Sequence, residues 1–300
     1  MTAASATQSP LSDLATTGVQ VPIGPLLVQV RSDLPQVDRH LRSLYADFPI
    51  TSGAGGHFNV TIAQTPGVRR FVRPQANIAV NGVAPFLPLP AAISGGAFEW
   101  TLNWCIGRHA HQRVAVHAAV VEKDGRALIL SGPSGSSKST LCAALVLEDW
   151  RLFSDEFALI DPVNGLLFPL PRPIALKDAA IGIIRGRKAG VVYGPEGHNV
   201  EGERFAHMKP PAESVHRSRE QASPACVVVP RWIAGSPARL EPLTKARALI
   251  HLTDQSFNYN YLGVNGYQCL VDVVRRSTCY TLEYGELDDA LAILRNAIQD

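Results

Sequence analysis

LILSGPSGSSKSTLCAAL, residues Leu128 to Leu145, is the most informative stretch of this sequence. A nucleoside-triphosphate loop follows the pattern G-x-x-x-x-G-K-[ST] and lies between a strand and a helix. Gly132, Lys138 and Ser139 stand where the pattern requires them, whereas Ser137 replaces its last glycine. The apolar run before Gly132 predicts the strand, and the run after Lys138 predicts the helix. The predicted nucleotide-binding residues are Gly132, Pro133, Ser134, Gly135, Ser136, Ser137, Lys138, Ser139 and Thr140.

The groups of such a loop have different roles in binding a nucleotide. Backbone amides and the helix N-terminus bind the β- and γ-phosphates of ATP. Lys138 would neutralise phosphate charge, and the Ser139 hydroxyl would complete a Mg²⁺ shell. Ser137 adds a side chain where the backbone approaches the anion. If this position needs a glycine-only dihedral, the cost is of order 1–3 kcal/mol. If Ser137 instead has helical geometry, this cost would be far smaller.

A loop of this kind also needs a metal-binding acid at a strand end. The stretch WRLFSDEFALI provides Asp155 and Glu156 directly after an apolar run, one predicted helix downstream of the loop. By themselves, two acids between short strands would fit a solvated hairpin corner better. Beside a strand, a loop and a helix with Lys138 and Ser139, they favour a metal site.

The rest of the chain falls into three predicted regions. Residues 1–19 are rich in Ser, Thr and Ala and predict a flexible N-terminus. Residues 20–95 predict a small α+β lobe, with strands at FNVTIAQ and at QANIAVNGVAPF, the latter turning at Asn81-Gly82. Residues 96–300 predict an ATP-binding domain that starts with an amphipathic helix at FEWTLNWCIGRHA. Within it, the glycine-rich segment 181–211 predicts an extended loop.

Composition excludes several classes of protein. Lys and Arg total 28 and Asp and Glu total 26, which gives a formal net charge of +2 and no electrostatic case for nucleic-acid binding. The sequence has no apolar run of 18 residues, so it predicts no membrane-spanning helix. The first residues also lack the pattern of a secretory signal. The five cysteines are scattered and predict reduced thiols, so we expect a cytoplasmic protein.

At this point the residues suggest a family. VHAAVVEKDGRALILSGPSGSSKSTLCAALVLEDWRLFSDEFALID, residues 116–161, resembles the catalytic core of HPr kinase/phosphorylase, and more closely the HPr-kinase-related kinase A group. The resemblance implies an α/β fold of the HPr kinase/phosphoenolpyruvate carboxykinase type, a P-loop core with a mixed sheet flanked by helices. The parent family is hexameric, so a homo-oligomer stays open.

The same resemblance implies roles for individual residues. Asp155 would be the general base that takes the proton from an acceptor hydroxyl, and Glu156 would hold Mg²⁺ with Ser139. His117 would lie near the transferred phosphate or orient Asp155, although a lone histidine on a strand is more often a core residue. Two departures, the missing glycine-rich signature and an unusual N-terminal lobe, argue against HPr itself as the acceptor.

Other candidates lie outside the resemblance. Arg172, between Pro171 and Pro173, is a candidate phosphate or substrate contact, because its backbone is stiff. The run SFNYNY, Ser256 to Tyr261, fits packing better than a binding pocket.

The sequence therefore predicts an ATP- and Mg²⁺-dependent kinase that acts on a hydroxyl, most simply serine in a protein or peptide. A metabolite kinase or carboxykinase-like enzyme and a nucleotide-sensing binding protein without turnover are the alternatives.

Overall fold

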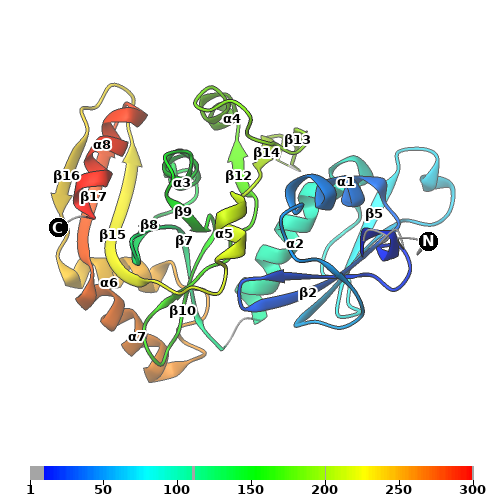
Figure 1. Cartoon of the computed structure of the whole chain (residues 1–300), viewed down its shortest axis with the longest axis horizontal. Coiled ribbons are helices and arrows are strands. Elements are labelled where there is room, and N and C mark those ends of the chain that lie inside the picture. The colour runs from blue at the N-terminus through cyan, green and yellow to red at the C-terminus, as the bar shows by residue number, and fades with distance from the viewer. Residues whose placement is uncertain (1–9, 110–111, 200, 299–300) are drawn as a thin grey trace, which may run out of the picture.

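Three β-sheets with helices packed against them build this α/β protein, seen in a computed structural model that describes residues 10–109, 112–199 and 201–298 (Figure 1). The predicted α/β class is confirmed. Two of the sheets are mixed and lie along the long axis of the molecule, with the N-terminal sheet at the right of the figure. The third sheet is small and antiparallel.

The N-terminal sheet has the strand order β3-β1-β2-β4-β5-β6. Strands β2 and β4 are parallel, and the other neighbours are antiparallel. Alternate residues of β1, β2, β4 and β5 are buried, since helices α1 and α2 cover one face. The elements are η1 Pro10–Asp13, β1 Val19–Ile23, β2 Leu26–Ser32, α1 Pro35–Leu44, β3 Thr51–Ser52, β4 Phe58–Gln64, η2 Val68–Arg70, β5 Gln75–Val80, β6 Leu89–Pro90, η3 Ala91–Ile93 and α2 Ser94–His109.

The central sheet has the order β11-β10-β7-β8-β15-β17-β16, with β9 paired to β7. Within this sheet, among the residues described, β8–β15 and β15–β17 pair in parallel and the other neighbours are antiparallel. The strands are β7 Val114–Lys123, β8 Arg126–Ser131, β9 Arg151–Ser154, β10 Phe157–Ile160, β11 Leu167–Phe168, β15 Ser223–Trp232, β16 Arg239–Pro242 and β17 Thr278–Tyr284. The small sheet is β12 Ile174–Lys177, β14 Arg204–Met208 and β13 Gly197–His198, in that spatial order.

Helices cover both faces of the central sheet, so most residues of its middle strands β7 and β8 are buried. Leu128 and Leu130 of β8 enter a core with α3 and α8, whereas Ala127 and Ile129 enter a core with α6 and α7. The helices are α3 Lys138–Leu147, α4 Ala179–Arg185, α5 Ala212–His216, α6 Lys245–Asp254, α7 Gly263–Arg276 and α8 Leu287–Ala297.

Helix α2 joins the two larger sheets. Its Phe98 and Leu102 are buried in the N-terminal core, and the same core includes Ala115 of β7 and Phe157 and Leu159 of β10. The N-terminal sheet therefore packs, through α2, against β7 and β10 of the central sheet.

Two sequence expectations need correction. The flexibility predicted for residues 1–19 stays a prediction: residues 10–13 form η1 and Leu14 is buried, and residues 1–9 lie outside the described ranges. Asn81 and Gly82 form the predicted turn, both with positive φ. The second strand expected after this turn does not form in the described structure, where Val83 makes a single bridge to Val80 of β5. The segment 181–211, expected to be an extended loop, contains most of α4 and all of β13 and β14.

The physical reason for the last error is local. Glycines dominate the segment in sequence, but Ile181 and Ile184 lie three residues apart on one face of α4 and are buried. No helix in the described ranges is both long and apolar enough to cross a membrane.

Candidate functional site

The loop between β8 and α3 has the predicted strand–loop–helix order. Strand β8 ends at Ser131 and helix α3 begins at Lys138. A Cβ atom at Gly132 would lie 2.8 Å from Ser136 Oγ, and Gly135 has a φ of +82°. A side chain at Gly132 would therefore displace the Ser136 hydroxyl, and the backbone conformation at Gly135 favours glycine. Pro133, Ser134 and Gly135 are exposed, so the tip of the loop faces solvent.

Lys138 lies back across this loop. Its side chain is only 6% exposed, and Nζ donates hydrogen bonds to the carbonyl oxygens of Gly132 at 2.7 Å and Pro133 at 2.9 Å. Burial lowers the pKa of Lys138, while Glu156 and Asp155 act in the opposite direction. The ammonium group is thus held next to the loop backbone and within electrostatic reach of both acids.

Ser137 has the strained, left-handed backbone conformation and not the helical one. Its φ of 69° and ψ of 16° are left-handed, and it is the N-cap of α3 without a side-chain cap hydrogen bond. Left-handed geometry costs a residue with a Cβ atom about 1–2 kcal/mol. Burial raises the pKa of Tyr284 on β17, and a hydrogen bond with the Ser137 side chain partly opposes this rise. The serine that replaces glycine therefore has a partner of its own.

Asp155 lies in the two-residue turn between β9 and β10. It is 6% exposed, and its Oδ2 accepts a hydrogen bond of 2.9 Å from the Ala175 backbone N–H. Oδ1 is buried without a hydrogen-bond partner among the described residues. Burial, followed by the charge of Glu156, raises the pKa of Asp155 to about 7, against the effects of Ala175, Ser139 and Lys138. The Ser139 side chain is thus close to Asp155.

Glu156 and His117 face one another beside Asp155. His117 Nε2 lies 3.7 Å from Glu156 Oε2, with both side chains partly exposed. Burial, with the nearby charge of Lys138, lowers the pKa of His117 to about 4. The imidazole is therefore neutral at pH 7 and able to donate or accept a hydrogen bond. Burial raises the pKa of Glu156 as well, against the charge of Arg172.

These groups fit a hard cation. The donors are oxygen atoms of Ser139, Asp155 and Glu156, and the unpartnered Asp155 Oδ1 is a buried acceptor in need of a positive partner. No cluster of three or more His, Cys, Asp or Glu side chains with metal-site geometry occurs in the described part of the chain. Mg²⁺ commonly needs only one or two carboxylates when phosphates supply further oxygens, so the set suits magnesium bound with a nucleotide.

Arg172 lies close to the site but already has partners. It is 5% exposed, and Nη1 donates to Glu99 Oε2 at 3.3 Å, while Nη2 donates to Asn103 Oδ1. Its guanidinium thus binds helix α2. The expected phosphate contact of Arg172 stays a prediction.

The segment after α6 contains residues that the sequence did not assign to the site. The Phe257 ring is centred 6.1 Å from the His117 ring. Asn258 is buried: Oδ1 accepts from the Ala115 N–H at 2.9 Å, and Nδ2 donates to the Arg113 carbonyl at 2.8 Å. The SFNYNY run is thus fixed to β7 beside His117. Pairings across more than 140 residues leave no local signal in the sequence.

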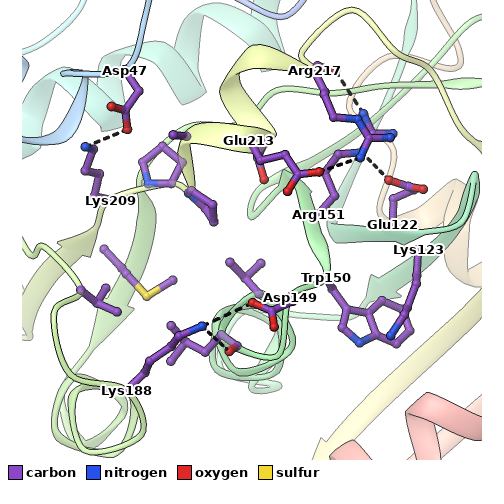
Figure 2. Close-up of a pocket in the computed structure, with 18 of the residues that line it drawn as sticks. Asp47, Glu122, Lys123, Asp149, Trp150, Arg151, Lys188, Lys209, Glu213 and Arg217 are labelled. Carbon is purple, nitrogen blue, oxygen red and sulfur yellow. Dashed lines mark hydrogen bonds and ion pairs between the residues drawn. The ribbon is translucent and has the colours of Figure 1, made fainter.

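A cavity of about 700 Å³ lies elsewhere, at the C-terminal end of α3 (Figure 2). Leu147 and Asp149 line it, whereas the loop lies at the other end of this helix, roughly 15 Å away for ten residues. Its Lys188 and Lys209 pair with Asp149 and Asp47, respectively. Residues 132–140 do not line this cavity.

No model of a known protein family matches this sequence, and no curated protein matches it either.

Proposed function

We propose that this chain is an ATP- and Mg²⁺-dependent kinase that transfers the γ-phosphate to a hydroxyl, with serine in a protein or peptide as the acceptor. The observation that carries the proposal is Asp155. It is a buried carboxylate with a pKa near 7 and one unpartnered oxygen, and both Lys138 and Ser139 of the loop influence its pKa. A general base works best when its pKa lies near the operating pH.

The proposal assigns the core to the P-loop type of HPr kinase and phosphoenolpyruvate carboxykinase, and the chain to the HPr-kinase-related group. The strand–loop–helix, the histidine on the preceding strand and the acidic pair after the next strand support this assignment. A cytoplasmic location remains part of the proposal and agrees with five buried, free cysteines.

In the proposed reaction, amides of the loop hold the β- and γ-phosphates, and Lys138 exchanges its carbonyl partners for phosphate oxygens. Asp155 accepts the proton of the acceptor hydroxyl. The hydroxyl oxygen forms a bond to the γ-phosphorus as the bond to the β-phosphate oxygen breaks, and ADP leaves. Mg²⁺, held by Ser139, Asp155 and Glu156, supplies charge neutralisation to the phosphates when bound. Neutral His117 can orient a carboxylate by hydrogen bonding.

The test is transfer from γ-labelled ATP, with Mg²⁺, into a size-fractionated extract of the source cell. Asp155→Asn should reduce labelling by at least about 100-fold and keep nucleotide binding, because it removes the base and little volume. Lys138→Ala should abolish labelling and weaken nucleotide binding. Asp149→Asn is the matched control, since its carboxylate is 89% exposed and pairs only with Lys188 among the ion pairs described.

The outcomes separate the candidate functions. Label in one protein or peptide band with wild type alone supports the proposal. Label in small solutes would instead indicate a metabolite kinase. Full activity of Asp155→Asn would refute the base assignment.

A nucleotide sensor without turnover is the second candidate, because Ser137 holds the loop in a left-handed conformation next to Tyr284. Tight ATP binding without labelling or hydrolysis would favour it, and Ser137→Gly should then increase turnover.

A further inference from the structure

A buried carboxylate on α2 connects the N-terminal helices with the segment before β12. Glu99 is 3% exposed, and its Oε1 lies 2.8 Å from His40 Nε2 and 2.8 Å from the hydroxyl of Tyr45. Its Oε2 accepts from Arg172 Nη1 at 3.3 Å. His40 is in α1 and Tyr45 directly follows it, so Glu99 joins three segments in one buried network.

The network continues from Arg172 toward the acidic pair along two routes. The first passes through Asn103, which lies one helical turn after Glu99 on the same face of α2 and accepts from Arg172 Nη2. The charge of Arg172 and the Asn103 side chain both act on the Glu156 carboxylate. Asn103 thus binds Arg172 on the side of Arg172 that faces the acidic pair.

The second route follows the backbone. Pro171 and Pro173 restrict the chain on both sides of Arg172. Three residues after Arg172, the N–H of Ala175 donates to Asp155 Oδ2 at 2.9 Å. Fixing the Arg172 guanidinium on α2 therefore also fixes the backbone that binds Asp155.

We propose that Arg172 and Asn103 are positioning residues, through which Glu99 and the N-terminal helices hold the acidic pair Asp155 and Glu156 in place for the metal–nucleotide complex. The inference rests on the proposed function, and it gives the N-terminal sheet and its helices a part in the site. A buried ion pair by itself adds little to the stability of the fold, because the desolvation of both charges offsets their attraction. Partners behind a metal-binding carboxylate fix its orientation, and losing them typically weakens metal binding 10–100-fold.

The experiment measures Mn²⁺ binding by electron paramagnetic resonance, with the full chain and a non-hydrolysable ATP analogue. Asn103→Leu removes the amide, keeps the size and favours the helix, so the variant should fold. We expect it to raise the Kd for Mn²⁺ about tenfold and to change the metal-free affinity for the analogue less than twofold. Arg172→Met should act in the same direction, and thermal unfolding would verify that each variant is folded.

Lys177→Met is the matched control. Lys177 also acts on Glu156 through its charge, but it is about half exposed and binds Glu203 at the surface. If only charge mattered, Lys177→Met would weaken Mn²⁺ binding as Arg172→Met does. We expect less than a twofold change.

The results that overturn the inference are distinct from failure of the proposed function. Equal effects of all three variants, or an unchanged Kd in a folded Asn103→Leu protein, would show that Arg172 and Asn103 do not position the acidic pair. Absence of metal-dependent nucleotide binding in the wild type would refute the proposed function and this inference together.

Discussion

Ser137 combines backbone strain with a side-chain contact, and the two can be separated by substitution. Ser137→Ala keeps the left-handed backbone and loses the interaction with Tyr284, so we expect a loss of about 1 kcal/mol in the free energy of unfolding. Ser137→Gly relieves about 1–2 kcal/mol of strain but loses the contact and gains freedom in the unfolded chain. Its stability should stay within about 1 kcal/mol of wild type. Urea unfolding measures both.

The Tyr284 contact has its own check. In a Tyr284→Phe background, Ser137→Ala should cost clearly less than in wild type, because the partner hydroxyl is already gone. Equal costs in the two backgrounds would mean that the serine hydroxyl does not stabilise the loop.

At the scale of single elements, Asn258 extends the hydrogen bonding between β7 and the segment after α6. Strand β10 pairs with Val114–His117 of β7, and the side chain of Asn258 binds backbone groups of Ala115 and Arg113. Asn258→Ala would leave a buried N–H and a carbonyl without these partners. We expect a loss of about 2–3 kcal/mol in the free energy of unfolding by urea.

Asn260→Ala is the matched control for this prediction. Asn260 is exposed and two residues away, so the same substitution should change stability by less than about 0.5 kcal/mol. Similar losses for both variants would contradict a specific role of Asn258.

The elements around the loop were predictable because their signals are local. The apolar run of β8, the glycines of the loop and the helix start at Lys138 are adjacent in sequence, and each is found as predicted. The small sheet was missed because β12 and β14 are four- and five-residue strands separated by more than 25 residues rich in glycine. The partners of Arg172 could not be predicted either, because Glu99 is 73 residues away in the sequence and leaves no local signal.

At the scale of the whole molecule, the chain is held together by a polar network as well as by apolar cores. His40, Glu99, Arg172 and His207 are all buried, and they come from α1, α2, the segment before β12 and β14. The ring centroids of His207 and His40 are 5.8 Å apart. A change of charge inside this network should therefore affect the stability of the entire fold.

His207 makes that dependence measurable. Burial lowers the pKa of His207 to about 4, and the charge of Glu99 opposes this shift while His40 and Arg172 reinforce it. Between pH 6.5 and about 4, the unfolded chain therefore binds a proton at His207 and the folded chain does not. The stability from neutral His207 is complete above pH 6.5 and is lost as pH falls through 4.

Urea unfolding at pH 7.5 and pH 4.5 tests this. Between the two values, His207 should account for a loss of about 2–3 kcal/mol, at 1.36 kcal/mol per pKa unit. His207→Gln cannot titrate in this range, so its loss of stability should be smaller than that of wild type by this amount. Other groups, His117 among them, contribute equally to both proteins and cancel in the difference. Equal pH dependence would contradict a neutral, buried His207.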